Sequence, residues 1–211
     1  MGKKKREILV QFNKKIILET AEKLFLEKGI KQTTMDDISK AADYSKSTIY
    51  VYFKSKEEIY NHIIYDHMCE LRDVTNQCIK EATNFEECYY TICNKLFLLY
   101  EQYPLYFSSI MGNISIDEKA LAENEILQQI YDIGEEIANS MTLLFERGIS
   151  ENYLSSDISI LPSVFTLWAS LGSLITMSNE KESYILKRMN MKKSEFLQHG
   201  FQMLFHSIKR R

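Results

Sequence analysis

A stretch of fourteen residues, Ser45–Glu58, concentrates side chains that can form hydrogen bonds with a charged polymer. Its sequence, SKSTIYVYFKSKEE, combines hydroxyl groups and lysines with two large apolar side chains, Ile49 and Phe53, spaced by four. A spacing of four is about one helical turn, so both apolar side chains lie on one face of a helix. Hydroxyl groups can bond to base edges and phosphates, and lysines to phosphates. These residue types and their spacing therefore indicate a short helix that recognises nucleic acid.

The groups expected to contact DNA lie on this helix or directly beside it. At about 100° per residue, the face opposite the apolar pair carries Ser47, Thr48 and Val51. Hydroxyls and a branched methyl face can read base edges, including the thymine methyl group. We expect Ser45 to cap this helix and Lys56 to lie in the first turn of the next one, where exposed N–H groups hold phosphate. The complete predicted DNA-binding set is Thr34, Ser45, Lys46, Ser47, Thr48, Tyr50, Val51, Tyr52 and Lys56.

Catalytic and metal-binding patterns have no comparable support. His62, His67 and the cysteines show none of the spacings of ligand pairs such as C-x2-C or His at i, i+4. No Ser/His/Asp set, glycine-rich phosphate loop or clustered carboxylates can be identified. We therefore expect no enzyme, no cofactor and no metal site. Free cysteines are often buried core residues, and we expect reduced thiols at Cys69, Cys78, Cys88 and Cys93.

The charge is distributed unevenly along the chain. The whole chain has 26 Lys and Arg against 29 Asp and Glu, a net charge of −3. Residues 1–56 contain 13 basic and 7 acidic side chains, a net of +6, and the remainder contains 13 and 22, a net of −9. The head is still +2 without the four cations of residues 3–6. A basic head on an acidic body predicts two parts with different partners.

The elements that position the basic stretch are predicted to be helices. Apolar residues recur at helical spacing almost throughout, and only 2 prolines and 7 glycines are present, so we predict an all-α protein. A first helix is expected from Lys14 to Gly29, with the glycine as its terminator. A second begins after Thr34, where Asp37 can complete a capping box, and a third begins after Ser45. Two short helices joined by about three residues form a helix-turn-helix.

A long helix is predicted to join this three-helix head to a helical body. It runs from Lys56 towards Glu81. In the helix at 117–146 we expect Asp117 as the N-cap and Gly148 as the terminator. The predicted helices of the body are 85–102, 104–110, 117–146, 161–178 and 193–209.

The segment Ala21–Glu58 resembles the DNA-binding domain of the TetR family of bacterial repressors, over about the first quarter of the chain. The turn departs from the family pattern, because Asp43-Tyr44 replaces a glycine and a small aliphatic residue. Aspartate tolerates the left-handed conformation better than most residues, so we expect the turn to be retained. Ser47 also stands where glycine is common. The matching elements are Leu24-Phe25, Gly29, Thr33-Thr34, Ile38, Ala42, Ser45-Lys46, Thr48-Ile49-Tyr50, Tyr52-Phe53 and Ser55-Lys56-Glu57-Glu58.

The resemblance implies a homodimeric repressor that binds a palindromic operator in double-stranded DNA and is released by a small-molecule inducer. It also implies that the helices at 161–178 and 193–209 pair with their twofold mates as a four-helix bundle. The chain then divides into a DNA-binding domain, residues 1–55, and a ligand-binding and dimerisation domain, residues 56–211. The N-terminus has no apolar run of the kind found in secretion signals, so we expect a cytoplasmic protein.

Aromatic side chains are unusually frequent in the predicted helices of the body. Core packing is the simpler explanation for any single one. As a group they suggest a ligand site, because a buried tyrosine needs a partner for its hydroxyl and a polar ligand group can supply it. We predict an apolar, aromatic or amphipathic inducer bound by Tyr89, Phe97, Tyr100, Tyr103, Tyr106, Phe107, Tyr131, Phe165 and Trp168.

Three alternatives bear on this interpretation. An enzyme that contains a three-helix head is disfavoured by the missing catalytic set. A DNA-binding regulator without a small-molecule ligand would instead be controlled by a partner protein or by thiol oxidation. The uncharged stretch Ile158–Asn179 is long enough to cross a bilayer, but it contains Pro162 and many hydroxyls and lacks close flanking Lys or Arg clusters. We therefore predict that it is a helix buried in protein, with no membrane contact.

Overall fold

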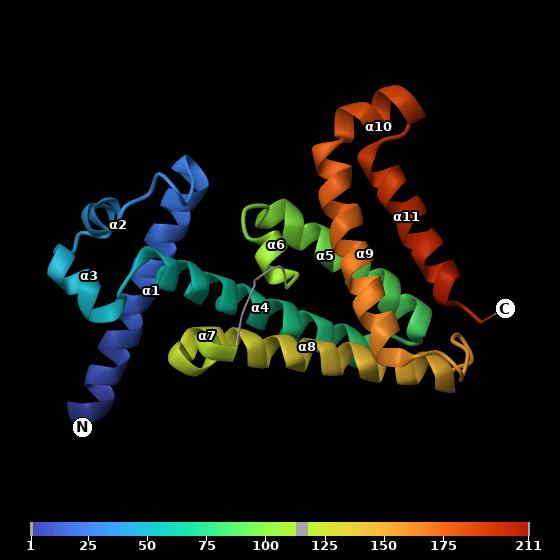
Figure 1. Cartoon of the computed structure of the whole chain (residues 1–211), viewed down its shortest axis with the longest axis horizontal. Helices are drawn as coiled ribbons and strands as arrows, with labels where there is room; N and C mark the ends of the chain where they lie inside the picture. Colours follow the sequence, from blue (N-terminus) through green and yellow to red (C-terminus); the bar gives the residue numbers. More distant parts are fainter. Residues whose placement is uncertain (1, 113–117, 211) are drawn as a thin grey trace. The chain divides into compact units, whose positions relative to one another are not determined.

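The computed structural model of the protein describes residues 2–112 and 118–210. The regular elements in these ranges are helices, as predicted, and an isolated bridge joins Leu154 to Lys209. Figure 1 shows the helices in chain order. Their bounds are α1 Gly2–Lys28, α2 Met35–Ala41, α3 Lys46–Tyr52, α4 Lys56–Glu81, α5 Phe85–Gln102, α6 Phe107–Ile110, α7 Glu118–Glu123, α8 Glu125–Ser150, α9 Ile160–Glu180, α10 Glu182–Met189 and α11 Lys193–Ile208.

The chain forms two compact units, and each is described by itself. The first contains Met1–His67 and Ile116–Ile130, and the second contains Met68–Ser115 and Tyr131–Arg211. The boundary between these two units lies inside α4, and the first turns of α4 pack on α1. In that packing the ring of Tyr60 meets Phe25 edge-on, with ring centroids 6.4 Å apart.

The core of the head is built from one apolar face of each of its first three helices. Thr34 caps α2 in a capping box with Asp37, and Ser45 caps α3, so both predicted helix starts are confirmed. Asp43, in the turn between these helices, has φ of 57°, which confirms the predicted left-handed conformation. The side chains that form this core are at most 1% exposed and are Ile17, Ala21, Phe25, Ile38, Ile49 and Phe53.

The first helix is longer than predicted at its N-terminal end. It begins at Gly2 rather than near Lys14, and it ends just before Gly29, which has φ of 83°. Most residues between 3 and 13 have high helix propensity, and no proline interrupts them, so the helix propagates backwards from its packed part. The apolar pattern alone misses this extension because few of these side chains are buried.

In the second unit, α4 and α8 lie side by side (Figure 1) and are joined by polar contacts. Ser140 Oγ donates to Asn76 Oδ1 at 2.6 Å, and an Arg72 guanidinium nitrogen lies 2.9 Å from a Glu136 oxygen. The ends of α4 and α5 are as predicted, and Asn84 caps α5 by accepting from the Glu87 N–H group at 2.9 Å.

The predicted helix at 117–146 is wrong in two respects. The described part begins at Glu118 and is interrupted at Asn124, which separates α7 from α8, while the proposed cap Asp117 lies outside the described residues. Gly148 does not end α8, which continues to Ser150. A side chain at Gly148 would place its Cβ 2.8 Å from Phe85 and 2.9 Å from Leu154, so this glycine permits close packing inside the helix.

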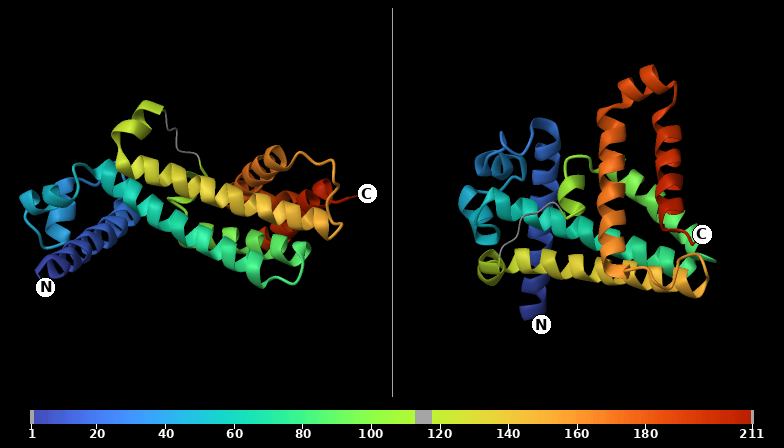
Figure 2. Two further views of the ribbon diagram at one scale, coloured as in Figure 1. Left: turned by 90° about the horizontal axis from the view of Figure 1, so that it is seen from below. Right: turned by 45° about the vertical axis from the view of Figure 1, so that its right-hand side comes forward.

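The two last long helices lie side by side, and α10 joins them at one end (Figure 1 and Figure 2). The short helix α10 was not predicted, and it ends at Asn190 in the left-handed conformation. Gly200 of α11 allows the close approach of α9, because a Cβ there would lie 2.5 Å from a Leu174 methyl carbon. The predicted helix at 104–110 shortens to α6, which begins three residues after Pro104.

Among the described helices, α9 is long and apolar enough to span a bilayer by length and composition. Core helices of soluble proteins pass the same test, so the finding assigns no membrane contact. The predicted burial of this helix holds for one face only. Leu161, Phe165 and Met177 expose 53%, 57% and 45% of their surface. At about 100° per residue Leu161 and Phe165 are neighbours on the exposed face, and Met177 lies at its other edge.

Candidate nucleic-acid interface and apolar pocket

Helix α3 presents most of the predicted DNA-contacting side chains on its outer face. Val51 exposes 78% and Tyr50 46% of its surface, whereas the core-facing Ile49 is fully buried. Ser45 Oγ accepts from the Thr48 N–H group at 3.1 Å and lies 2.8 Å from Ser47 Oγ. The N-terminal turn of α3 therefore carries a cluster of hydroxyls that can donate or accept beside an exposed branched side chain.

Lys46 is held at the edge of this face by the preceding helix. Its ammonium lies 2.7 Å from Asp36 Oδ1, and the Asp36 carboxylate raises the pKa of Lys46. Both side chains are more than half exposed, and exposed ion pairs contribute little to stability. A phosphate could therefore replace Asp36 as the partner of Lys46 at little energetic cost.

Asn13 of α1 braces both ends of α3, which the sequence pattern did not reveal. Its side-chain Oδ1 accepts from the Tyr44 hydroxyl at 2.9 Å, and its Nδ2 donates to the Tyr52 hydroxyl at 2.7 Å. The Tyr52 hydroxyl, predicted to contact DNA, is thus engaged with α1. The one sequence signal for this brace is a polar amide, Asn13, placed one turn before Ile17 on the helix face that becomes buried.

Lys56 and Thr34, also predicted to contact DNA, support the loop between α1 and α2. The Lys56 ammonium donates to the carbonyl oxygens of Ile30 and Thr33 at 2.7 and 2.9 Å. The Thr34 hydroxyl donates to Asp37 Oδ2 at 2.7 Å within the capping box. The Lys28 ammonium, followed by Thr34, holds the pKa of Asp37 below its usual range. In this structure both predicted contacts therefore have positioning roles within the head.

The nine aromatic residues predicted for the ligand site do not gather around one cavity. Tyr131 and Phe165 expose 46% and 57% of their surface, which places them on the surface of the second unit. Tyr106 and Phe107 are buried in the core. Tyr89 lines the pocket described next, and the half-buried members of the set are Phe97, Tyr100, Tyr103 and Trp168.

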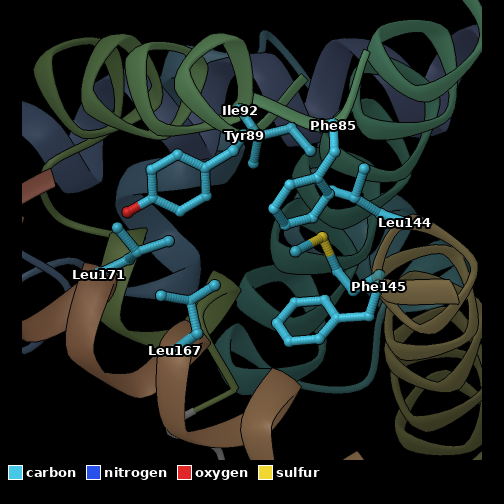
Figure 3. Close-up of a pocket in the computed structure, with 8 residues that line it drawn as sticks. Phe85, Tyr89, Ile92, Leu144, Phe145, Leu167 and Leu171 are labelled. Carbon is cyan, nitrogen blue, oxygen red and sulfur yellow. The ribbon is translucent and has the colours of Figure 1, made fainter. Parts of the chain in front are cut away.

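An apolar pocket lies between α5, α8 and α9 (Figure 3). Figure 3 shows Leu167 and Leu171 of α9 opposite the rings of Tyr89 and Phe145. The Tyr89 hydroxyl, the one side-chain oxygen among the lining residues, donates to the Phe201 carbonyl at 2.8 Å. In this structure the lining side chains leave no room for a water molecule. The lining residues are Phe85, Tyr89, Ile92, Met141, Leu144, Phe145, Leu167 and Leu171.

The aliphatic part of this lining was not predicted. Ile92, Leu144 and Leu171 follow the same helical spacing as ordinary core residues, so the sequence cannot separate the two roles. The predicted aromatic set therefore includes Tyr89 of this pocket and none of the aliphatic side chains that complete it.

Arg147 joins the end of α4 to α8, close to the pocket. Its guanidinium donates to the carbonyl oxygens of Ile79 and Ala82 at 3.0 and 2.9 Å, and to Glu151 Oε1 at 2.6 Å. Glu151 Oε2 in turn accepts from the N–H group of Phe85, at the start of α5. Because the last carbonyls of a helix have no intrahelical partner, Arg147 satisfies groups that α4 leaves open.

Three of the four cysteines are buried in the second unit. Burial raises the pKa of Cys88 and of Cys93 to about 12, and it also raises the pKa of Cys78. Cys69 is half-buried. The thiolate is the reactive form of cysteine, so the three buried thiols are poorly suited to oxidation sensing.

Residues 17–63 match the model of the family described as bacterial regulatory proteins, tetR family. This segment of the chain is therefore similar to the DNA-binding domain of the TetR family. Over 74 residues it is 39% identical to the uncharacterized HTH-type transcriptional regulator YhgD of Bacillus subtilis, covering 35% of this chain and 39% of that protein. Over 44 residues it is 48% identical to IcaR of Staphylococcus epidermidis, a negative transcriptional regulator of the biofilm operon icaADBC, covering 21% and 24%. The matched segments thus span less than half of these TetR-like relatives.

Two solved structures share the fold over nearly the whole chain. The fatty acid degradation regulator FadR from Bacillus halodurans has a TM-score of 0.69 at 20% identity, covering 94% of this chain and 97% of that one. FadR from Bacillus subtilis, in complex with stearoyl-CoA, has a TM-score of 0.68 at 18% identity, covering 92% and 98%. At these identities the likeness establishes the TetR-type fold of the body and no ligand.

Proposed function

We propose that the protein is a cytoplasmic transcriptional repressor that binds a palindromic operator as a homodimer and releases it when a small apolar molecule enters the body. The observation that carries this proposal is the outer face of α3, with Ser47, Tyr50 and Val51 exposed on a helix braced by α1. A helix of seven residues can contact only a few base pairs. Two copies related by a twofold axis would recognise two half-sites and so bind a specific DNA sequence.

The dimer surface is proposed to be the exposed apolar face of α9 together with α11. Phe165 on α9 and Met203 on α11 expose 57% and 61% of their surface. Exposed apolar side chains on two adjacent helices suit an interaction site, and a twofold dimer would cover them with the same surface of the second copy. The predicted segments 161–178 and 193–209 thus supply the face that pairs.

The ligand is proposed to place a hydrocarbon or aromatic group in the pocket between α5, α8 and α9. The lining offers no free polar group, so apolar contact would supply the binding energy there. The stearoyl-CoA bound by FadR from Bacillus subtilis carries a long acyl chain, which makes acyl compounds reasonable first probes. Because the lining side chains fill the pocket, a ligand would have to push them apart.

Arg147 offers a route from this pocket to the DNA-binding helix. Leu144 and Phe145 line the pocket on α8, and Arg147 follows within one turn and holds the C-terminal end of α4. The other end of α4 begins four residues after α3 ends. A ligand that displaces α8 can therefore shift α4 and with it α3, which weakens operator binding by the factor by which DNA weakens ligand binding.

Control by thiol oxidation, the alternative left open by the sequence, has less support because three of the four thiols are buried and have raised pKa values. Control by a partner protein predicts that no small molecule changes operator affinity.

The DNA-binding half of the proposal is tested by selecting duplexes from a random pool with the purified protein. We expect a palindrome with half-sites about one helical turn apart, or a multiple of it. Val51→Ala should relax the preference at one base pair per half-site, by about 1–3 kcal/mol at most, and leave the salt dependence unchanged. Val74→Ala on α4 is the matched control. Recovery of duplexes without a shared sequence, or an unchanged preference in Val51→Ala, would contradict the assignment.

The ligand-binding half is tested on the selected operator with saturated fatty acids, acyl-CoA thioesters and aromatic acids. We expect at least one compound to weaken operator binding about 5- to 150-fold, as for a typical coupling of about 1–3 kcal/mol. Leu167→Phe should narrow the pocket and abolish this response while retaining operator binding. Leu143→Phe, the same change at an exposed position of α8, is the control. Equal responses of the two variants would rule out this pocket.

A further inference from the structure

The first three turns of α1 project beyond the core of the head. Ile17 is the first fully buried residue of this helix, whereas all side chains from Lys4 to Leu9 are exposed. Both views in Figure 2 show the N-terminal end of α1 extending past α2 and α3. At about 1.5 Å per residue, the helix from Asn13 back to Lys4 is about 14 Å long.

The end of this projection carries a cluster of cations. Lys4, Lys5 and Arg6 are exposed in consecutive positions, and Glu7 is the one acidic residue near them. None of the ion pairs within residues 2–112 and 118–210 involves these three side chains. Cations near the N-terminus of a helix oppose its dipole rather than stabilise it. The stability of α1 therefore does not explain why these three cations are present. They could bind an anionic partner.

The N-terminal projection of α1 begins next to α3, the proposed recognition helix. Asn13, where it begins, bonds to Tyr44 in the turn before α3 and to Tyr52 in its last turn. The next residue, Lys14, has its ammonium 5.7 Å from the centre of the Phe53 ring, just past the end of α3. The cationic cluster thus continues the face that the proposed function assigns to DNA.

We propose that the N-terminal projection of α1 binds the phosphate backbone of the operator, outside the base pairs read by α3. This inference rests on the proposed function, because it needs α3 in the major groove. Duplex DNA carries one negative charge per about 1.7 Å of its axis, so several phosphates lie within reach of the three long cationic side chains at the end of this helix. The projection adds affinity without adding base preference, because phosphates carry no direct sequence information.

The same projection also exposes the apolar side chains of Ile8, Leu9 and Phe12, at 62%, 57% and 59%. A protein surface that covered them would be a rival occupant. We favour DNA because the cations are unpaired and because the projection is continuous with the proposed DNA face. The two occupants differ in their response to salt, which provides the test.

The test is the salt dependence of operator binding by the full-length protein and by the variant K4A/K5A/R6A. Each phosphate contact contributes about 0.9 to the slope of log affinity against log salt, so the slope should fall by about 2–3 units. Nuclease protection should shorten at both outer edges of the operator, while the selected base sequence stays the same. The control K181A/K187A/R188A removes the same charge from the region of α10 and should leave both readouts unchanged.

Three results would overturn the inference while leaving the proposed function intact. A slope that falls equally in the control variant would indicate a general effect of net charge, and an unchanged slope in K4A/K5A/R6A would exclude the phosphate contacts. The variant I8S/L9S/F12S, if it alone weakens operator binding at an unchanged slope, would indicate an apolar partner for the projection. If the wild-type protein selects no operator, the proposed function fails and the inference with it, which the duplex selection reveals independently.

Discussion

Replacing Phe165 with glutamate is expected to convert the proposed dimer into monomers at micromolar concentration. Phe165 exposes 57% of its surface on the exposed face of α9, and twofold pairing would bury two copies of it. Each dimer would then bury two carboxylates without partners. At about 3 kcal/mol per copy, the dissociation constant rises by a factor of about 10,000. Operator binding should be lost together with the dimer.

The measurement is sedimentation equilibrium of the wild-type and variant proteins, followed by operator binding. Leu98→Glu on α5 is the matched control, because Leu98 exposes 55% of its surface and lies outside the predicted dimer segments. We expect this variant to remain dimeric. A dimeric Phe165→Glu protein with full operator affinity would exclude α9 as the dimer surface, and a monomeric wild-type protein that still binds specifically would exclude the dimer itself.

Replacing Arg147 with methionine is expected to lower the free energy of unfolding by about 2–4 kcal/mol. The guanidinium is about one-quarter exposed and holds the Ile79 and Ala82 carbonyls as well as the Glu151 carboxylate. Methionine keeps much of the apolar volume but leaves these acceptors without their donor. Losing hydrogen bonds to a charged group and leaving a half-buried carboxylate unpaired both cost stability.

Urea unfolding of the full-length protein measures this effect, with Arg188→Met on the exposed face of α10 as the control. The loss in Arg147→Met should be smaller in a Glu151→Gln background, because the unpaired carboxylate is then absent. Equal midpoints for Arg147→Met and Arg188→Met would contradict the bridging role. If Arg147 also transmits ligand binding to α4, the variant should show a weaker effect of ligand on the operator.

Interactions within one helical turn were sufficient to predict where α2 and α3 begin. Thr34 with Asp37 and Ser45 could be recognised as helix starts because a capping side chain bonds to an N–H group two or three residues away. The outward position of Val51 followed in the same way, since the helical period places it away from Ile49 and Phe53. Such interactions lie within one turn, so the order of residues is enough to predict them.

The contacts that brace the head were decided by the tertiary structure. Asn13 and Tyr52 are 39 residues apart, and Lys56 reaches a carbonyl 26 residues earlier. No local pattern distinguishes these polar side chains from solvated ones, and their partners are backbone or hydroxyl groups that many residues could provide. Their assignment to DNA stays a prediction, and only the packing of α1, α3 and α4 reveals their contacts within the head.

The body depends still more on packing. The ends of α4 and α5 could be predicted from the sequence, because these helices begin and end where the helical spacing of apolar residues begins and ends. Gly148 was read as a helix terminator, whereas the approach of Phe85 and Leu154 requires it inside α8. The pocket is lined from three helices by side chains such as Ile92, Leu144 and Leu171, whose apolar character is the same in a solid core. Sequence alone determined that these helices exist and which of their faces are apolar. Only the packing decided which apolar side chains surround a pocket, because the lining depends on the distances between helices that are far apart in the chain.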